Sequence, residues 1–327
     1  MHDIAVVIPV KNEGKTIQPL LKSLEALQEK PKEVVVVDGG SSDQTVGLIR
    51  DYIRSASLPY SLKVIGTDGA LPGKGRNLGV QNSTAPLIAC TDAGGVVDRN
   101  WLGELIAPFQ DPEVDLVVGC CRSNASTFFE RLSFFLFLKN IRRKSLIYSG
   151  GASIAFRRTL WEEIGGFPEA LYPCEDKYFL IKARQRARRV REAPAACVYW
   201  SPRSNLIGFA NQYFLYGRGD GRIRFAPLYH GLRLLAYGAG VLLVFLGGPV
   251  GRGVTATAFF AYLGEVSLRA FREIRSGRVF LCVPLLLVVK DLSQIVGFPL
   301  GWLEGSFDAT FRQLRKALGP RPPDATH

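Results

Sequence analysis

The most constraining feature of this sequence is a pair of short, unbroken apolar runs near its beginning. Residues 4–10 and 34–37 are rich in Val and Ile and show no alternation of apolar and polar positions. Such runs are typical of parallel strands that are covered on both faces. The segment between them, residues 16–28, has apolar side chains at a helical period, namely Ile17, Leu20, Leu21, Leu24 and Leu27. Strand, helix and strand in this order predict a right-handed βαβ unit.

The same alternation continues to residue 90. We expect further helices over 46–53 and 76–82, and further strands over 62–65 and 87–90. The pattern predicts an α/β fold with an open, Rossmann-like sheet and flanking helices. Since such sheets bind ligands at the carboxyl ends of their strands, the residues that follow each strand are the candidates for a site.

The second apolar run ends on a carboxylate, Asp38, in the stretch VVVVDGGSSDQT. One interpretation is that Asp38 and Asp43 only cap the next helix, with Ser41 and Gln44 forming a capping box. The other is that Asp38 faces a ligand in the crevice at the strand ends. This stretch alone leaves both interpretations open.

The composition changes after residue 225. Residues 231–249 are nearly free of charge and about as long as a membrane span. Residues 254–271 and 279–302 are weaker candidates because each contains two charged side chains. We therefore divide the chain into a domain over 1–225, membrane-anchoring helices over 226–305, transmembrane or interfacial, and a basic tail over 306–327.

The charge distribution favours a membrane surface over nucleic acid. The chain has 41 basic and 29 acidic residues and a net charge of +12. The arginine run at 184–191 lacks the interleaved aromatic side chains that stack on bases, so we expect a solvated or membrane-facing helix there and no nucleic acid partner. Arginines between the second and third apolar segments place that loop in the cytosol. The six cysteines show no metal-ligand spacing and indicate reduced thiols.

Five polar clusters fall at strand or helix ends in the first 180 residues. They are PVKNEG at 9–14, VDGGSSD at 37–43, GKGRNLG at 73–79, CTDAGG at 90–95 and YPCEDKYF at 172–179. Each is weakly specific alone, but together and in this order they resemble the family 2 glycosyltransferases of the GT-A fold. The resemblance covers roughly residues 4–224 and implies a GT-A, Rossmann-like mixed sheet with flanking helices.

The resemblance also implies a nucleotide-diphosphate sugar as donor, with UDP favoured on family grounds. Pro9 and Glu13 would line the nucleoside pocket, and Asp38 would accept the ring N–H of a uracil. A carboxylate suits this position because it only accepts hydrogen bonds. For Glu13, a solvated loop residue is the alternative.

Lys74 and Arg76 lie in a glycine-rich stretch that we expect to be a loop opening a short helix. Their charges and the backbone N–H groups suit the diphosphate of the donor. The spacing fits neither a Walker P-loop nor a dinucleotide fingerprint. For Lys74 alone, an ordinary surface lysine is an equal interpretation.

Similar enzymes carry a D-x-D motif that contacts ribose and a divalent metal where this chain has TDAGG. Asp92 is present, and Gly94 replaces the second carboxylate. We therefore leave Mg²⁺ or Mn²⁺ open, with Asp92 as the candidate ligand, because one carboxylate can hold Mg²⁺ together with phosphate oxygens and water. Asp98 could compensate, but its position favours a helix start.

Glu175 and Asp176 match the acidic pair that precedes the acceptor site in similar enzymes. The resemblance implies that Asp176 is the general base for an inverting, in-line attack on the anomeric carbon and that Glu175 orients the acceptor. A carboxylate base is plausible because the histidines lie outside these motifs. If the acceptor is a polyprenyl phosphate, Asp176 would only position it. A salt bridge to Lys177 or Arg184 is the structural alternative.

Two further stretches bear on the membrane. Residues 211–222 resemble the segment that lies at the membrane surface in related synthases, so Gln212 and Arg218 are candidates for contacting the diphosphate; a solvated amphipathic helix is the alternative. The aromatic stretch 128–140, followed by IRRK, is too short to span and indicates an interfacial or a buried core helix.

These features together predict a membrane-associated glycosyltransferase of the hexosyltransferase type. It would transfer a sugar from a nucleotide sugar to a lipid-linked or glycan acceptor, in cell-surface polysaccharide or glycolipid synthesis. We expect it at the cell (inner) membrane, in contact with membrane lipids, with the catalytic domain in the cytosol. Three apolar segments are too few for a polysaccharide channel, so single-sugar addition is expected. A sugar-phosphate nucleotidyltransferase, or a non-catalytic scaffold with a degenerate GT-A domain, are the alternatives.

Overall fold

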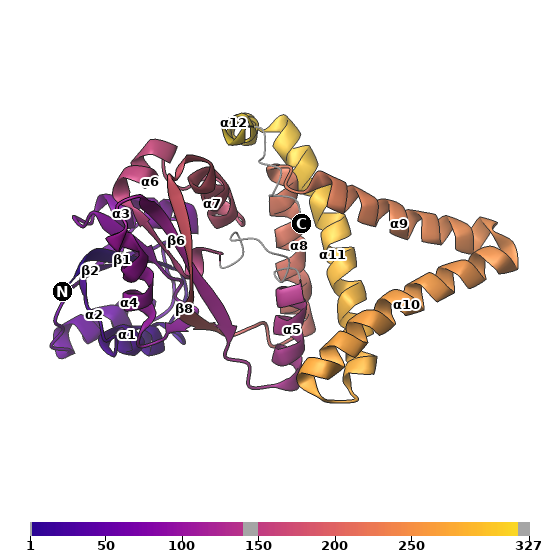
Figure 1. Cartoon of the computed structure of the whole chain (residues 1–327), viewed down its shortest axis with the longest axis horizontal. Helices are drawn as coiled ribbons and strands as arrows, with labels where there is room; N and C mark the ends of the chain where they lie inside the picture. The colour runs from indigo at the N-terminus through magenta and orange to yellow at the C-terminus, as the bar shows by residue number, and fades with distance from the viewer. Residues whose placement is uncertain (1, 140–149, 320–327) are drawn as a thin grey trace. The chain divides into compact units, whose positions relative to one another are not determined.

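The computed structural model describes residues 2–139 and 150–319 (Figure 1). The chain forms two compact units. Unit 1 falls within residues 1–124 and 145–201, and unit 2 within 125–144 and 202–319. The sequence placed a boundary at 225, whereas the structure groups the segment from 202 onward with the C-terminal helices.

Among the described residues, unit 1 contains one eight-stranded mixed sheet with the order β3-β2-β1-β4-β7-β6-β8-β5. The strands are β1 (His2–Val10), β2 (Pro31–Asp38), β3 (Ser61–Gly66), β4 (Leu87–Cys90), β5 (Gly95–Val97), β6 (Val114–Ser123), β7 (Ile154–Arg157) and β8 (Arg189–Trp200). Strands β1 to β4 pair in parallel, as predicted. Strand β7 runs antiparallel to both β4 and β6. Because β1 to β4 are parallel, their carboxyl ends lie at one edge of the sheet, and the loops that follow them gather there.

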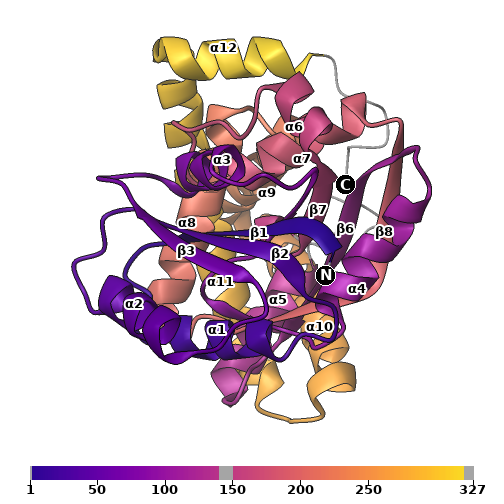
Figure 2. The same ribbon diagram turned by 90° about the vertical axis from the view of Figure 1, so that its left-hand side faces the viewer.

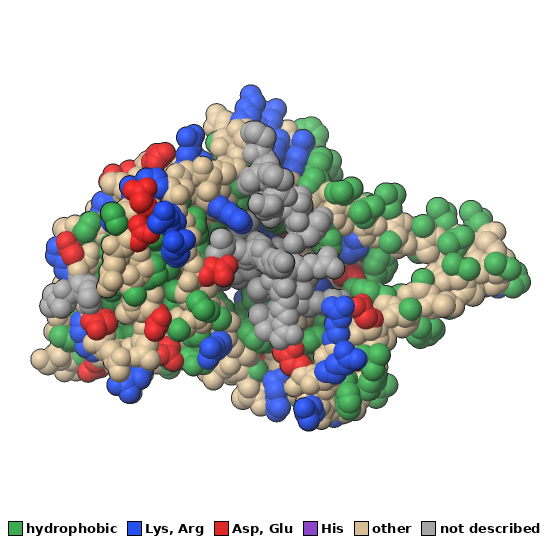
Figure 3. Space-filling model, viewed as in Figure 1, with side chains coloured by type: hydrophobic (Ala, Val, Ile, Leu, Met, Phe, Trp, Pro, Cys, Tyr) green, Lys and Arg blue, Asp and Glu red, His purple; other side chains and the backbone are tan. Residues whose placement is uncertain are grey.

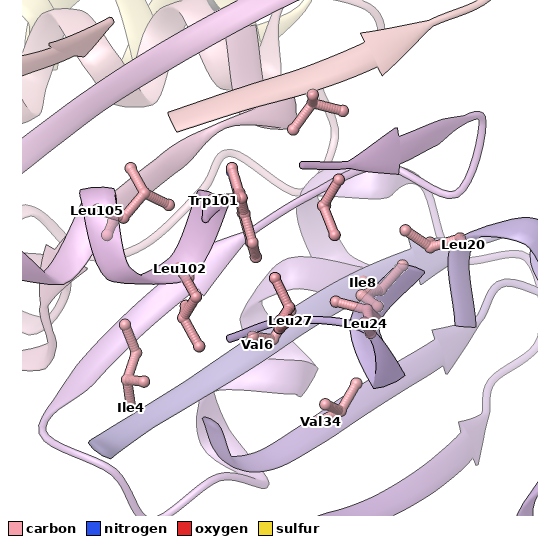
Figure 4. Close-up of a cluster of buried hydrophobic side chains, with 14 of the residues drawn as sticks. Ile4, Val6, Ile8, Leu20, Leu24, Leu27, Val34, Trp101, Leu102 and Leu105 are labelled. Carbon is pink, nitrogen blue, oxygen red and sulfur yellow. The ribbon is translucent and has the colours of Figure 1, made fainter. Parts of the chain in front are cut away.

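Helices cover both faces of this sheet (Figure 2). They are α1 (Ile17–Glu25), α2 (Thr45–Ser55), α3 (Pro72–Gln81), α4 (Trp101–Ile106), α6 (Arg158–Ile164) and α7 (Glu175–Arg186), with a 3₁₀ turn at Ala107–Gln110. Ile4, Val6 and Ile8 of β1 pack with residues of α1 and α4 (Figure 4). Ile49 of α2 belongs to the same cluster. Ala5 and Val7 pack with residues of α3, α6 and α7. Successive strand residues point to opposite faces, which explains why these strands show no polar alternation.

Two local predictions in unit 1 were wrong. Helix α3 begins at Pro72, not at residue 76, because a proline at the first helical position is already held at a helical φ angle. The capping box before α2 does not form: Gln44 makes no side-chain cap bond, and Asp43 accepts a hydrogen bond from the Thr45 N–H at 3.0 Å.

The arginine run at 184–191 is not one helix either. Helix α7 ends at Arg186, and β8 begins at Arg189. Arg188 lies between them and pairs with the carboxylate of Asp115 at 2.6 Å. The chain changes from helix to strand here, and the run contributes structural ion pairs.

Unit 2 is helical in its described residues. Its helices are α5 (Phe128–Lys139), α8 (Leu206–Arg222), α9 (Pro227–Leu246), α10 (Gly248–Ile274), α11 (Val279–Phe307) and α12 (Ala309–Leu318). Helices α8 and α11 approach so closely that a Cβ added to Gly301 would lie 1.9 Å from the carbonyl oxygen of Arg218. Glycines four residues apart permit this contact, as they do in many membrane helix pairs.

Two described helices, α9 and α11, are long and apolar enough to cross a membrane by length and composition. Their most apolar windows have mean hydropathies of 1.4 and 2.0, so the third predicted segment is more apolar than the first. Its charged side chains Lys290 and Asp291 are buried. Helix α10, the second predicted segment, does not meet the same test among the described residues. Figure 3 shows hydrophobic side chains gathered on the surface of α9 and α10.

The predictions for residues 128–140 and for the basic tail can be compared with the described part of unit 2. Leu132, Phe135 and Leu136 of α5 are buried in the apolar core of this unit, as expected of a core helix. The IRRK stretch after α5 lies outside the described residues. The predicted basic tail, 306–327, begins at the end of α11 and continues as helix α12, before which Asp308 accepts a hydrogen bond from the Thr310 N–H at 2.7 Å. Residues 320–327 of the tail lie outside the described part.

Candidate active site

The loops that follow β1 and β2 are tied together at the carboxyl edge of the sheet. The Asn12 side-chain oxygen accepts a hydrogen bond from the Ser42 N–H at 2.8 Å, and the Asn12 N–H donates to the Ser41 hydroxyl at 2.8 Å. The Glu13 N–H donates to the Thr45 hydroxyl, also at 2.8 Å. The first two polar clusters of the sequence therefore form one structure.

Asp38 lies at the end of β2 and is buried. Its carboxylate accepts hydrogen bonds from the backbone N–H groups of Gly40 and Ser41, each at 3.1 Å, and from the Ser41 hydroxyl. Gly40 has a φ angle of +84°, which this sharp turn requires. Asp38 therefore holds its own turn, and its contact with a base remains a prediction.

The other two predicted nucleoside contacts lie near this turn. Pro9 is on β1, and a Cβ added to Gly75 of α3 would lie 3.0 Å from the Pro9 Cβ atom. Glu13 is half-buried, and its carboxylate accepts a hydrogen bond from the Thr16 hydroxyl. Helix α3 therefore starts close against the end of β1.

Arg76 of α3 brings two of the predicted carboxylates together. Its guanidinium donates through Nη1 to Glu175 Oε1 at 2.8 Å and through Nη2 to Asp92 Oδ1 at 2.6 Å. The Arg76 and Glu175 side chains are buried, whereas that of Asp92 is 45% exposed. The Arg76 Nε–H has no hydrogen-bond partner within the described residues. The buried guanidinium of Arg76 thus joins the loop after β4 to the start of α7.

Asp176 lies beside this group, in the first turn of α7. Its Oδ2 atom accepts a hydrogen bond from the Gly151 N–H at 2.9 Å, and its Oδ1 atom accepts one from the Lys177 N–H at 2.7 Å. A Cβ added to Gly151 would lie 2.4 Å from Arg76 Nη2, so only glycine fits between these two side chains.

The cluster carries an excess of negative charge, since three carboxylates surround one guanidinium. Burial, followed by repulsion from Asp176, raises the pKa of Glu175 to about 7, against the opposing effect of Arg76. Although burial disfavours its charge, Asp92, Glu175 and Asp176 together raise the pKa of the Arg76 guanidinium. The cluster therefore favours binding of one more positive charge or proton.

Three further predicted site residues have other surroundings among the described residues. Lys74 forms no described hydrogen bond or ion pair, and its side chain is half-buried in the first turn of α3. In unit 2, Gln212 donates to the Tyr216 hydroxyl at 2.8 Å. Arg218 pairs with Glu304 at 2.6 Å. The contact of Gln212 and Arg218 with the diphosphate of a donor remains a prediction.

The described side chains near Asp92 offer few ligands for a metal ion. Among the described residues, no group of three or more His, Cys, Asp or Glu side chains could hold a metal ion. One oxygen of Asp92 already accepts from Arg76. Around Gly94 there is open space, because an added Cβ would meet no atom within 4 Å. Protein side chains thus supply one candidate ligand, and any ion would need oxygen atoms from the donor.

Asn77 organises the site, although sequence reasoning did not select it. Its side-chain nitrogen donates to the Phe167 carbonyl at 2.9 Å, and its oxygen accepts from the Phe167 N–H at 2.8 Å. These bonds fix the loop before α7 against α3, next to Arg76. The signal was available, because Asn77 follows Arg76 directly in GKGRNLG.

Comparison with known proteins assigns residues 5–164 to a family. Residues 5–164 match the domain described as glycosyl transferase family 2. The chain carries a family 2 glycosyltransferase domain. This confirms the family predicted from the five polar clusters.

Curated relatives of this glycosyltransferase domain are longer proteins. The chain is 29% identical over 231 residues to the pre-mycofactocin glycosyltransferase of Mycobacterium tuberculosis, covering 66% of this chain and 46% of that protein. It is 28% identical over 210 residues to the poly(ribitol-phosphate) β-N-acetylglucosaminyltransferase TarS of Staphylococcus aureus, covering 62% of this chain and 36% of that protein. The chain thus spans less than half the length of these two relatives.

A solved structure supports the fold. The mannosyltransferase PcManGT from Pyrobaculum calidifontis, solved in complex with GDP-Man and Mn²⁺, matches with a TM-score of 0.61 at 20% identity, over 94% of this chain and 88% of that chain. At this identity the likeness shows the fold alone. The predicted GT-A fold, a mixed sheet with flanking helices, is confirmed.

Proposed function

We propose that this chain is a membrane-associated, inverting glycosyltransferase. It transfers a sugar from a nucleotide-diphosphate sugar, with UDP as the favoured nucleotide, to a lipid-linked or glycan acceptor at the cytosolic face of the cell membrane. The observation that carries the proposal is the convergence of Asp92, Glu175 and Asp176 around Arg76 in unit 1. Groups whose pKa values are shifted by burial and by specific charged partners cluster at functional sites.

The donor side of the proposal rests on the edge formed by β1, β2 and α3. A carboxylate has about four lone-pair sites, so Asp38 keeps acceptor capacity for a base N–H beside its bonds to the turn. Lys74 forms no described ion pair and is available to the diphosphate, together with the N–H groups of the first turn of α3. Pro9 and Glu13 complete the proposed nucleoside pocket.

The acceptor side rests on Asp176. Two backbone N–H groups, those of Gly151 and Lys177, hold its carboxylate. In the proposed reaction the acceptor hydroxyl oxygen attacks the anomeric carbon and its proton passes to Asp176. The bond from the anomeric carbon to the diphosphate oxygen breaks, and the diphosphate keeps the electron pair. Glu175 and Arg76 fix the start of α7, and therefore the position of Asp176.

A divalent ion fits only with the donor bound. Asp92 would supply one carboxylate oxygen, and diphosphate oxygens and water would supply the rest. When bound, Mg²⁺ or Mn²⁺ offsets charge on the departing diphosphate. The protein contributes Arg76, which holds Asp92 in place.

The membrane part of the proposal rests on α9 and α11. Both are long and apolar enough to span a bilayer. On α9, Leu235, Phe245 and Leu246 are 67%, 77% and 80% exposed, which is costly in water and ordinary in hydrocarbon.

The test is release of nucleoside diphosphate from a panel of nucleotide sugars. The full chain in detergent is incubated with lipid extract, with and without Mg²⁺ or Mn²⁺. We expect one donor to turn over in the presence of lipid, and Asp176→Asn to lower the rate by about 10²- to 10⁴-fold. Asp51→Asn, an exposed change on α2, serves as the matched control. If the folded protein neither binds nor turns over any donor, the proposal is excluded and a non-catalytic scaffold is favoured.

A further inference from the structure

Unit 2 contains a cavity of about 430 Å³ between α9 and α11. Its lining comes entirely from these two helices: Pro227, His230, Gly231, Arg233, Leu234, Gln294, Ile295, Phe298, Pro299, Trp302 and Leu303. The walls are mainly apolar and aromatic. The cavity therefore suits a hydrocarbon chain better than a sugar or a nucleotide.

A buried arginine gives the cavity one polar feature. The Arg233 side chain is 9% exposed, and its guanidinium contacts Gln294 Oε1 at 2.5 Å, His230 Nδ1 at 2.8 Å and Asp291 Oδ1 at 3.6 Å. Its Nε–H has no hydrogen-bond partner within the described residues. Because buried donors are rarely left without an acceptor, this N–H calls for a ligand oxygen.

The surroundings of the cavity indicate where such an oxygen would come from. The lining residues of α9 belong to its first two turns, at the depth where headgroups lie if α9 spans a bilayer. Arg224 stacks on the ring of Trp302, with 4.2 Å from its Cζ atom to the ring centroid. Beyond the cavity, α9 continues with exposed leucines, including Leu235 and Leu242. Positive charge near a headgroup position and an apolar track below it are complementary to an anionic lipid.

We propose that this cavity, an open groove between α9 and α11, binds one phosphate-headed membrane lipid. A phosphate oxygen accepts the Arg233 Nε–H, and the first part of a hydrocarbon chain lies on Leu234, Ile295 and Phe298 before following α9. The inference rests on the membrane part of the proposed function. It adds a lipid site in unit 2 that does not depend on the identity of the sugar donor.

The test uses Trp302 as a local reporter. The delipidated full chain in non-ionic detergent is titrated with phosphatidic acid carrying dibrominated acyl chains, which quench tryptophan fluorescence on contact. The Trp302→Phe variant gives the signal of the other tryptophans for subtraction. We expect saturable quenching by phosphatidic acid, and half-saturation at a concentration at least about tenfold higher for dibrominated diacylglycerol, which lacks the phosphate. Inorganic phosphate should not compete, because it brings no hydrocarbon chain.

Two glycines of α9 supply matched variants. Gly231 lines the cavity and Gly238 does not, and a Cβ added to either meets no atom within 4 Å. Gly231→Phe should fill the groove and weaken phosphatidic acid binding, while Gly238→Phe should leave it unchanged. Arg233→Lys keeps a charge near Asp291 but removes the Nε–H, and should reduce the preference for phosphatidic acid over diacylglycerol.

Three results would overturn the inference: equal quenching in the two glycine variants, equal affinity for the two lipids, or no saturable quenching at all. The last would also be found if a second copy of the chain covered the groove, which sedimentation in the same detergent would reveal. Release of nucleoside diphosphate is measured on the same preparations. Donor turnover without lipid binding would reject this inference and leave the proposed function intact.

Discussion

Replacing Arg76 by methionine should destabilise unit 1 more than any surface charge change. The Arg76 side chain is 3% exposed and that of Glu175 is 7% exposed, and they form a direct ion pair at 2.8 Å. Methionine fills similar space but leaves Glu175 buried without its counter-charge. Removing one partner of a buried ion pair costs about 3–5 kcal/mol.

A second substitution should return part of this loss. In Arg76→Met/Glu175→Gln, no unpaired charge remains buried at position 175, so we expect the double variant to regain about 2 kcal/mol relative to Arg76→Met. Glu175 can also escape the penalty by binding a proton, since its pKa already lies at about 7. The destabilisation by Arg76→Met should therefore be smaller at pH 5.5 than at pH 8.

The assay is thermal unfolding of the full chain in detergent, followed by circular dichroism. For a unit of this size, 3–5 kcal/mol corresponds to a decrease in Tm of roughly 10 °C. Arg54→Met is the control, because Arg54 is 77% exposed in a surface pair with Asp51 and should change Tm little. A double variant no more stable than Arg76→Met, or equal Tm values for the Arg54 and Arg76 variants, would refute the reasoning.

Three further predictions follow from the same contacts. Burial and Asp176 raise the pKa of Glu175 from 4.5 to about 7, so the folded state binds this proton more tightly than the unfolded chain does. The free energy of unfolding should therefore fall by up to about 3 kcal/mol as the pH rises across that range. Glu175→Gln should remove this pH dependence. Gly94→Asp, introduced into open space, should strengthen Mn²⁺ binding in calorimetric titrations with the nucleoside diphosphate, and unchanged Mn²⁺ affinity would show that position 94 does not face the metal. Gly301→Leu, placed 1.9 Å from the carbonyl oxygen of Arg218, should separate α8 from α11 and lower Tm, whereas Gly253→Leu, with no atom within 4 Å, should have little effect.

The parallel half of the sheet was predictable because its signal is local. Unbroken apolar runs and a helical period between them define β1, α1 and β2 without knowledge of distant residues. The other half depends on pairing across the chain: β4 pairs antiparallel with β7, and Cys90 lies opposite Ile154. No local pattern specifies that partner, so the sequence indicated an α/β sheet and the family resemblance alone supplied its mixed character.

The candidate site shows the same division. The order of the motifs along the chain identified four candidate residues individually, namely Arg76, Asp92, Glu175 and Asp176. The ion pair between Arg76 and Glu175 joins residues 99 positions apart, and spacing along the chain does not contain that information. The hydrogen bonds that Asp38 accepts from the N–H groups of Gly40 and Ser41 likewise depend on the folded turn.

In unit 2 the spacing of glycines is a sequence signal for helix packing. Gly297, Gly301 and Gly305 lie four residues apart on α11, and Gly217 and Gly221 are spaced in the same way on α8. This spacing is typical of closely packed helix pairs. It is consistent with the grouping of residues 206–222 with the C-terminal helices.

The central claim is that this chain transfers a sugar and that Asp176 takes the proton. The most direct measurement is mass spectrometry of a membrane lipid extract after incubation with the full chain and a mixture of nucleotide sugars. The account predicts lipid species heavier by one sugar residue with wild-type protein, reduced at least about a hundredfold with Asp176→Asn. Equal product with Asp176→Asn, or no glycosylated lipid or glycan from folded wild-type protein with any donor, would contradict it.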